Sequence, residues 1–330
     1  MQIALGIMFL LCHLCLISSA NAQLSTTKNH DFIVTFVGTG GPEINTAREG
    51  IATIVSVGDQ KMLFDVGRNT MQNLYEAGIN PIEVTDIFIT HLHNDHIEGL
   101  PTLWMTGWFL LGRTEPLRVW GPKGTQDMIN GMYQMYQFDI EQRSNRFNDK
   151  AHLDIIVSEI SEPQVVIQET EVIVSAITAQ HDDGDPAFGY TVEHQNHKVL
   201  MTGDGRLFKE LQDASKGVDV LISNILSMPE ALAKKPEMQG VVAKLMSVPE
   251  AATLFNKAKP GLAVYSHFVG KELPKDSDGF IEEQTRKAGY LGPLFLAKDG
   301  WSVNVKTLEV SSPPPKASLP NLDRKASYSN

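Results

Sequence analysis

The segment His91-Leu-His93-Asn-Asp95-His96 places four side chains that can bind metal ions within six consecutive positions. Two imidazoles two residues apart in an extended loop can face the same way and bind one cation, while Asp95 and His96 can turn toward a second. Neutral imidazole and carboxylate are the ligands that Zn²⁺ takes when thiolates are absent. Because the chain has only 10 histidines in 330 residues, three in this segment favour metal binding over an ordinary polar loop.

The elements around this segment predict where it lies in the fold. The run Asp86–Thr90 has the apolar pattern of a buried strand, and Pro101 is typical of the first turn of a helix. The cluster is therefore expected at the C-terminal end of a strand. In open α/β sheets ligands bind at that edge, because the loops converge there on a rigid support.

Further candidate ligands also follow predicted strands. They are His181 after Val172–Thr178, Asp204 in a Gly-Asp-Gly turn after Val199–Thr202, and His267 after Leu262–Tyr265. Taken alone, a His or Asp at a strand end is usually a turn or capping residue. Only their order and their common location at strand ends make them candidate ligands.

Between Asp31 and Lys306, short apolar runs alternate with helical patterns and Gly-containing turns, which favours a mixed α/β fold over a helix bundle or a β-sandwich. The predicted strands not named above are Phe32–Val37, Thr53–Val57, Lys61–Phe64, Gly189–Val192 and Val218–Ile222. No Pro/Gly/Ser-rich linker divides this region. We therefore predict one domain over residues 23–310, with two halves that meet near Glu159.

The first residues have a different character. Ala4 to Ile17 is an uncharged apolar run, and the small residues that follow, up to Ala22, resemble a secretory cleavage site. We therefore predict a cleaved signal peptide over residues 1–22, no membrane attachment after cleavage, and a periplasmic or secreted protein. Both cysteines, Cys12 and Cys15, lie inside this segment, so the mature chain offers no thiolate as ligand or nucleophile.

The net charge of −11 disfavours nucleic acid as a partner, because nucleic-acid affinity depends on Lys/Arg contacts to phosphates and no basic run is present. A small molecule is the expected partner, and the sequence leaves homo-oligomerisation open.

Residues 311–330 are rich in Ser and Pro without a repeating apolar face, which predicts a disordered tail.

The order of several short motifs resembles the metallo-β-lactamase fold hydrolases, and within them the ribonuclease Z and secreted arylsulfatase branch. Besides the His-x-His-x-Asp-His segment, the motifs are Phe36–Pro42, Phe64–Gly67, Phe188–Tyr190, Gly203-Asp204 and Ser266–Phe268. The resemblance covers nearly all of Asp31–Lys306. It implies an α/β fold in which four layers form an αββα sandwich with two similar halves.

The resemblance also implies roles for the candidate ligands. His91, His93 and His181 would hold one divalent ion, and Asp95, His96 and His267 a second, with Asp204 bridging the two. Both ions are expected to be Zn²⁺, with Asp95 and Asp204 as catalytic residues that position the attacking water. Asp65 falls where the family has a carboxylate that orients a ligand histidine; a turn-forming Asp is nearly as good an interpretation.

The implied activity is hydrolysis of an anionic ester, with an arylsulfatase-like or phosphodiesterase-like enzyme as the first choice. A periplasmic cyclic-nucleotide phosphodiesterase and a lactonase are alternatives, and a non-catalytic metal-binding or substrate-capture protein is a different class. Met246 and Asn224 stand where the branch often has a general-acid His and its Glu partner. Substrates with good leaving groups would best tolerate their loss.

The remaining candidate residues have less specific patterns. Trp104 and Trp108 are one helical turn apart, which favours core packing, with a pocket wall as the secondary interpretation. His194 and His197 flank a predicted hairpin turn and are expected to be exposed rather than metal-bound.

Overall fold

The computed structural model describes residues 31–315 except 145–148, 170, 272 and 275. The predicted signal peptide, its two cysteines and residues 316–330 of the predicted tail lie outside the described residues. Within the described part, no helix combines the length and the apolar character needed to cross a membrane.

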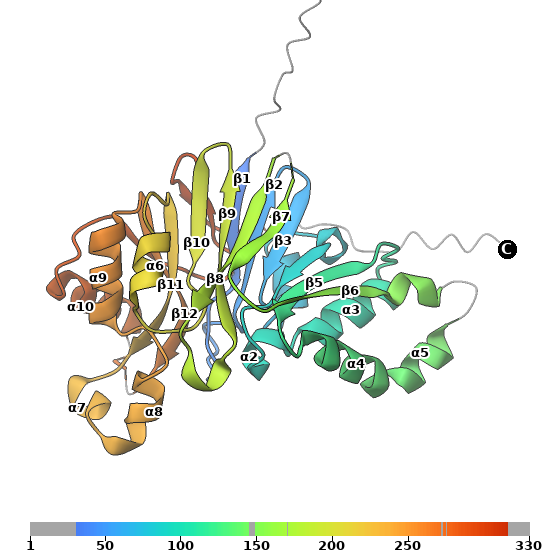
Figure 1. Cartoon of the computed structure of the whole chain (residues 1–330), viewed down its shortest axis with the longest axis horizontal. Helices are drawn as coiled ribbons and strands as arrows, with labels where there is room; N and C mark the ends of the chain where they lie inside the picture. The colour runs from blue at the N-terminus through green and yellow to red at the C-terminus, as the bar shows by residue number, and fades with distance from the viewer. Residues whose placement is uncertain (1–30, 145–148, 170, 272, 275, 316–330) are drawn as a thin grey trace, which may run out of the picture. The chain divides into compact units, whose positions relative to one another are not determined.

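Two β-sheets form the centre of the fold (Figure 1). The first has eight strands in the order β15-β14-β1-β2-β3-β4-β5-β6, and the second has seven in the order β13-β12-β11-β10-β9-β8-β7. The strands of the first sheet are β1 (Phe32–Gly38), β2 (Ala52–Val57), β3 (Gln60–Phe64), β4 (Asp86–Phe88), β5 (Leu117–Pro122), β6 (Ile155–Ile160), β14 (Ser302–Asn304) and β15 (Val310–Ser311). Those of the second are β7 (Gln164–Gln168), β8 (Ile173–Ala179), β9 (Ala187–His194), β10 (His197–Met201), β11 (Val220–Ser227), β12 (Leu262–Gly270) and β13 (Leu294–Leu296).

Helices cover both outer faces of the sheet pair. The α-helices are α1 (Thr70–Glu76), α2 (Asn94–Ile97), α3 (Leu100–Phe109), α4 (Thr125–Met135), α5 (Gln137–Arg143), α6 (Lys209–Ala214), α7 (Glu230–Ala233), α8 (Gln239–Val242), α9 (Val248–Ala258) and α10 (Ser277–Lys287). The short 3₁₀ helices are η1 (Pro81–Glu83), η2 (Lys150–Leu153), η3 (Asp182–Gly184) and η4 (Pro236–Met238). Pro101 stands in the first turn of α3, as the sequence predicted.

Three apolar clusters separate the layers. One lies between the two sheets and combines residues such as Phe36 and Phe88 of the first sheet with Tyr190 and Val264 of the second. Another joins the first sheet to α1, α3 and α4, and a third joins the second sheet to α6, α9 and α10. The order helix, sheet, sheet, helix confirms the predicted αββα sandwich. The chain passes from the first sheet to the second between β6 and β7, close to the predicted boundary at Glu159.

Each predicted strand is present with shifted ends, and the strands that the sequence did not reveal are weakly patterned. β6 and β7 end their sheets, and most of their side chains are partly or fully exposed. β5 contains Gly121 and Pro122, a dipeptide typical of turns. β13, β14 and β15 have only two or three residues each, too few to show a period.

The C-terminal boundary of the domain needs correction. Ser311, the first residue of the predicted tail, belongs to β15 and pairs with Ser302 of β14. Pro314 lies against Gly78, at the end of α1. The folded domain therefore extends beyond residue 310, because backbone pairing with β14 orders a segment that has no apolar face of its own.

Candidate metal centre

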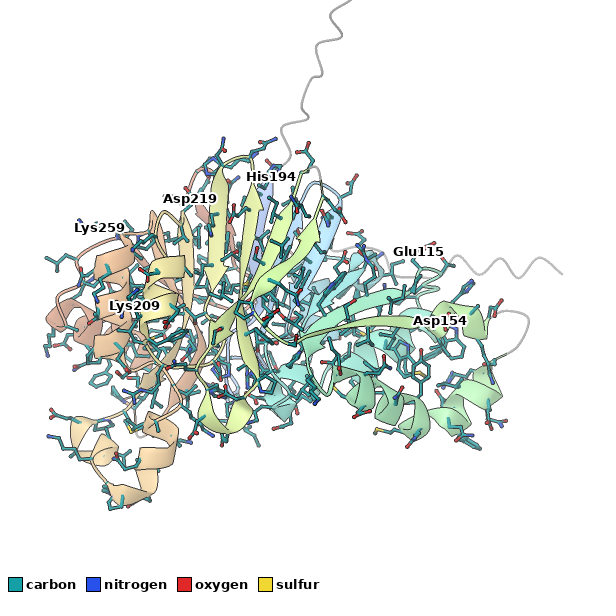
Figure 2. All side chains as sticks on the ribbon, viewed as in Figure 1. Glu115, Asp154, His194, Lys209, Asp219 and Lys259 are labelled. Carbon is teal, nitrogen blue, oxygen red and sulfur yellow. The ribbon has the colours of Figure 1, made fainter. Side chains whose placement is uncertain are left out.

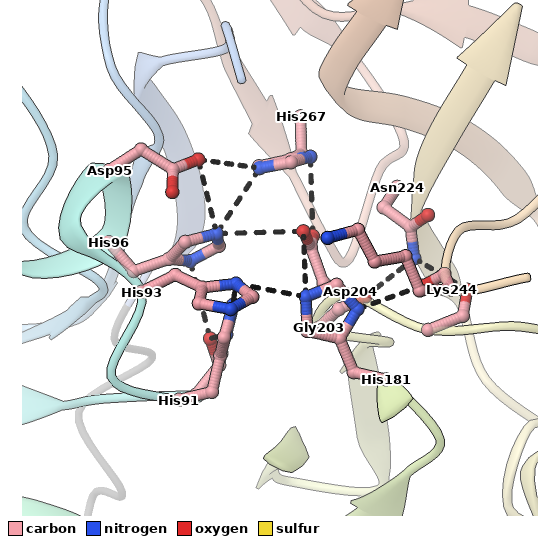
Figure 3. Close-up of polar contacts among 12 residues, drawn as sticks. His91, His93, Asp95, His96, His181, Gly203, Asp204, Asn224, Lys244 and His267 are labelled. Carbon is pink, nitrogen blue, oxygen red and sulfur yellow. Dashed lines mark hydrogen bonds and ion pairs between the residues drawn. The ribbon is translucent and has the colours of Figure 1, made fainter. Parts of the chain in front are cut away.

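Seven side chains from both sheets converge at one edge of the sandwich, where three overlapping groups are spaced to hold metal ions (Figure 3). The residues are those predicted from the sequence: His91, His93, Asp95, His96, His181, Asp204 and His267. The loop after β4 and the short helix α2 carry the first four. The second sheet contributes the other three, from the loops after β8 and β10 and from β12 itself.

The first group consists of His91, His93 and His181. Nε2 of His91 lies 2.9 Å from Nδ1 of His93, which lies 3.2 Å from Nε2 of His181. The other nitrogen of His181, Nδ1, lies 2.8 Å from the carbonyl oxygen of Lys244. A carbonyl only accepts, so Nδ1 of His181 donates and its Nε2 is the atom that faces the group and is free to bind a metal ion when the ring is neutral.

The second group consists of Asp95, His96 and His267. Nε2 of His267 lies 3.2 Å from Nε2 of His96 and 3.3 Å from Oδ2 of Asp95. The distance from Nε2 of His96 to Oδ2 of Asp95 is 3.6 Å. Each residue thus directs one ligand atom toward a common point, from α2 on one side and from β12 on the other.

His267 reaches this group because of a β-bulge, and the expectation that it follows the end of its strand is wrong. β12 continues through His267 to Gly270. Its register against β11 shifts between Tyr265 and Phe268, and His267 itself has a positive φ of 50°. A bulge turns a side chain away from the alternation of the strand. The bulge therefore directs the imidazole to the metal group.

Asp204 lies between the two groups. Its Oδ2 is 3.6 Å from Nε2 of His96 and 3.8 Å from Nε2 of His181, one residue of each group, and its Oδ1 is 3.2 Å from Nδ1 of His267. The preceding residue, Gly203, has φ 64°, and a β-carbon there would approach the carbonyl oxygen of Phe188 to 2.4 Å. Gly203 therefore permits the tight turn that brings Asp204 to its position between the two groups.

Asp65 fixes the orientation of His96. Its Oδ2 lies 2.8 Å from Nδ1 of His96, on the side of the ring away from the second group. The same carboxylate accepts hydrogen bonds from the backbone N–H and the hydroxyl of Thr90, at 2.8 and 2.9 Å. This is the contact that the orienting role requires, and the role itself stays a prediction. Thr90 was not singled out in the sequence, where only its place at the end of the predicted strand pointed to the site.

The ionisation of the metal-free cluster reflects its burial and its crowding. Burial and the neighbouring imidazoles hold the pKa of His91 well below its ordinary value. Burial alone would lower the pKa of His96 as well. The carboxylates of Asp65 and Asp204 outweigh this effect and raise the pKa of His96 well above its ordinary value. Burial opposes ionisation of Asp204, yet His267 and His96 lower the pKa of Asp204 overall. Both carboxylate and neutral imidazole ligands are thus available.

The donor set fits two divalent cations. Ring nitrogens and carboxylates, nearly all of them buried, face one another in two groups joined by Asp204. Opposed ring nitrogens such as those of His96 and His267 repel unless a proton or a cation lies between them. Two bound ions would supply this charge, increase the acidity of water and stabilise negative charge on substrate oxygens.

The tryptophans lie in the core and not at the site. Trp104 and Trp108 pack in the cluster between α3 and the first sheet. Their Nε1 atoms donate to the carbonyls of Leu153 and Asp149, at 2.8 and 2.9 Å. Neither lines the cavity of about 40 Å³ beside His96, Asp204 and His267. The secondary interpretation as a pocket wall is therefore wrong, because both indoles find their partners inside the helical layer.

Asn224 and Met246 are neighbours, but neither offers an acid. Met246 is completely buried among apolar residues of the layer formed by α9. Oδ1 of Asn224 accepts the backbone N–H of Met246 at 2.9 Å, and Nδ2 of Asn224 donates to the carbonyls of Gly203 and Gly205, at 2.7 and 3.2 Å. Asn224 thus joins the turn that carries Asp204 to the segment whose Lys244 carbonyl orients His181.

His194 is the last residue of β9, whose opposite end lies beside Thr90 and the cluster; Figure 2 shows His194 at the upper end of the sheets. The predicted hairpin turn is present between His194 and His197. The expected exposure of His194 is wrong: its ring is buried against Phe32, and Nδ1 lies 2.6 Å from the carbonyl oxygen of Glu171. His197 is half-buried. Neither belongs to the groups spaced for a metal ion within the described residues.

Comparison with known proteins agrees with this geometry. Residues 32–235 match the family described as Anti-Pycsar protein Apyc1. The chain is 30% identical over 244 residues to a Ribonuclease Z of Mycobacterium sp. (strain KMS). This alignment covers 73% of this chain and 85% of that protein.

Two solved structures share the architecture. The metallo-β-lactamase fold protein YhfI from Bacillus subtilis has a TM-score of 0.62 at 18% identity, covering 82% of this chain and 98% of that one. The short form of human tRNase Z has a TM-score of 0.61 at 22% identity, covering 86% and 100%. With a family match over more than half of its length, the chain belongs to the Apyc1 family, in the ribonuclease Z-like branch of the metal-dependent hydrolases with the metallo-β-lactamase fold.

Proposed function

We propose that this protein is a phosphodiesterase that uses two metal ions, most simply Zn²⁺, to hydrolyse small anionic esters. The observation that carries the proposal is the position of Asp204, with one oxygen within 4 Å of a ring nitrogen from each ligand group. Imidazole and carboxylate without thiolate favour Zn²⁺. Asp95 and Asp204 are the residues we assign to positioning the attacking water.

Phosphodiesters are placed before sulfate esters because of the relatives. A ribonuclease cleaves phosphodiester bonds, and a Ribonuclease Z matches most of this chain. The sulfate ester remains a competing substrate to be assayed. The net charge of −11 favours a small substrate over RNA, because a polyanion would be repelled along its whole length.

We also propose that residues 1–22 direct export, so that the mature enzyme begins at Gln23 and acts in the periplasm or outside the cell. The apolar run and the small residues before the cleavage position support this assignment. N-terminal sequencing of protein recovered from the culture medium or the periplasm tests it. An intact Met1 on active protein would show that no cleavage takes place.

The proposed activity is tested with a panel of substrates and purified mature protein loaded with Zn²⁺. The panel contains bis(p-nitrophenyl) phosphate, cyclic AMP, p-nitrophenyl sulfate and a homoserine lactone. We expect turnover of one or both phosphodiesters, loss of activity on chelation, and recovery when Zn²⁺ is restored. Turnover confined to the sulfate ester or to the lactone would contradict the proposal. The variant Asp204→Ala controls for a contaminating hydrolase.

A further inference from the structure

The cluster opens to solvent beside His93. The side chain of His93 is 34% exposed. In contrast, the side chains of the other candidate ligands are nearly buried: Asp95, His96, His181, Asp204 and His267. Asp183 lies at this opening, with Oδ1 3.8 Å from Nε2 of His93. A substrate therefore has to approach the metal groups past His93 and Asp183.

Lys244 reaches the same opening from the segment that follows α8. Its Nζ lies 2.8 and 3.1 Å from the two carboxylate oxygens of Asp183. Its carbonyl oxygen lies 2.8 Å from Nδ1 of His181, which fixes the backbone of Lys244 to the first ligand group. In Figure 3 the side chain of Lys244 extends from this anchored backbone toward the cluster.

The segment beside this rim is acidic: exposed Asp182 and Asp183 directly follow His181, and Asp185 accepts the backbone N–H of His181 at 3.4 Å. Together with the negative net charge, this rim opposes the approach of an anionic ester. A lysine ammonium is a mobile point charge with three donors, and it binds phosphate oxygens well. The Lys244 side chain is 25% exposed, so its ammonium can release Asp183 and bind a substrate anion while it stays in contact with solvent.

We propose that Lys244 binds the anionic group of the substrate, and that Asp183 is the counter-ion that holds the ammonium at the opening until substrate replaces it. This inference rests on the proposed function for its substrate class. It assigns the role to the side chain alone, because the carbonyl of Lys244 would orient His181 whatever side chain this position carries.

The test uses the mature chain loaded with Zn²⁺ and inorganic phosphate as the probe, with binding measured by calorimetry. Lys244→Gln should weaken phosphate binding by about ten-fold or more, since it removes a charged hydrogen-bond donor. Asp183→Asn should strengthen binding, since it removes the competing carboxylate. The matched control is Lys234→Gln, which removes an exposed lysine that pairs with Glu230 on α7. Metal content is measured for every variant.

Steady-state kinetics provides a second readout. Lys244→Gln should lower kcat/KM for bis(p-nitrophenyl) phosphate mainly through KM, whereas Lys234→Gln, which changes a lysine paired with Glu230 on α7, should leave both kcat and KM at their native values. Phosphate affinity equal to that of the native protein, or a loss matched by Lys234→Gln, would overturn the role of Lys244. Undetectable phosphate binding by the native protein would overturn it too. If phosphate binds through Lys244 but no phosphodiester is cleaved, only the proposed activity fails.

Discussion

The carboxylate of Asp65 lies 2.8 Å from Nδ1 of His96, while Nε2 of the same ring faces the second ligand group. Asp65 comes from the turn after β3 and has a positive φ of 58°. Hydrogen bonds from Thr90 hold its two oxygens in place. A non-glycine residue in this conformation is uncommon, and the contact to a ligand histidine gives a physical reason for it.

Asp65→Ala is therefore expected to weaken binding of one metal ion by about 10–100-fold, because the orientation of His96 is lost. Zn²⁺ affinity measured against a competing chelator checks this. Asp86→Asn is the matched control, since Asp86 is also a buried carboxylate but pairs with Arg118 and not with a ligand. Equal Zn²⁺ affinities in Asp65→Ala and native protein would exclude the orienting role.

Asp204→Ala should reduce both the number of ions bound and the rate of hydrolysis, because the carboxylate lies between the two groups. We expect about two ions per native chain by elemental analysis, and fewer in the variant. Asp213→Ala, which changes an exposed residue of α6 that pairs with Lys209 and Lys216, serves as control. Native metal content and turnover in Asp204→Ala would rule out a bridging role.

Zn²⁺ affinity should rise with pH across the neutral range. The carboxylates of Asp65 and Asp204 raise the pKa of His96 despite its burial, so the metal-free protein holds a proton on this ring to higher pH than an ordinary histidine does. Metal binding must release that proton, and the competition weakens as pH rises toward the raised pKa. Titrations at about pH 6, 7 and 8, in buffers that differ in ionisation enthalpy, measure the proton release. An affinity independent of pH would contradict it.

Asn224→Ala should destabilise the fold and disturb the turn that carries Asp204. The substitution leaves the backbone N–H of Met246 and the carbonyls of Gly203 and Gly205 without their partner. An unsatisfied buried group costs about 1–3 kcal/mol, so denaturant unfolding should detect the change. Ser223→Ala is the control, because the buried Ser223 hydroxyl donates to the carbonyl of its sequence neighbour Asn224 and to neither of the turns that Asn224 joins. An unfolding free energy of Asn224→Ala equal to that of the native protein would show that these hydrogen bonds of Asn224 do not stabilise the fold.

Local pattern was enough to predict a mixed α/β fold and to place candidate ligands at the ends of apolar runs, whereas the αββα sandwich was implied only by the resemblance to the metallo-β-lactamase fold hydrolases. It could not place His267 inside β12, since a bulge depends on the register between two strands and not on either sequence alone. It also missed Lys244, whose contact with His181 joins positions that are 63 residues apart in the chain.

The absence of an acid at Met246 leads to the last prediction. The Met246 side chain is completely buried among apolar residues, and Asn224 beside it carries an amide that cannot supply a proton for catalysis. A general acid typically contributes about 10²–10⁴-fold for poor leaving groups, so kcat/KM should fall steeply as the leaving-group pKa rises.

We would measure kcat/KM for a series of substituted aryl phosphodiesters with the native protein. Met246→His is a poor test here, because it would bury an imidazole in the apolar layer of α9 instead of restoring an acid. Lys244→Gln is informative, because removal of a residue that binds the anionic group should lower kcat/KM for every substrate in the series. The slope of log(kcat/KM) against leaving-group pKa should stay the same. A flat series for the native protein would mean that another group protonates the leaving oxygen or that chemistry is not rate-limiting, and single-turnover kinetics separates these two outcomes.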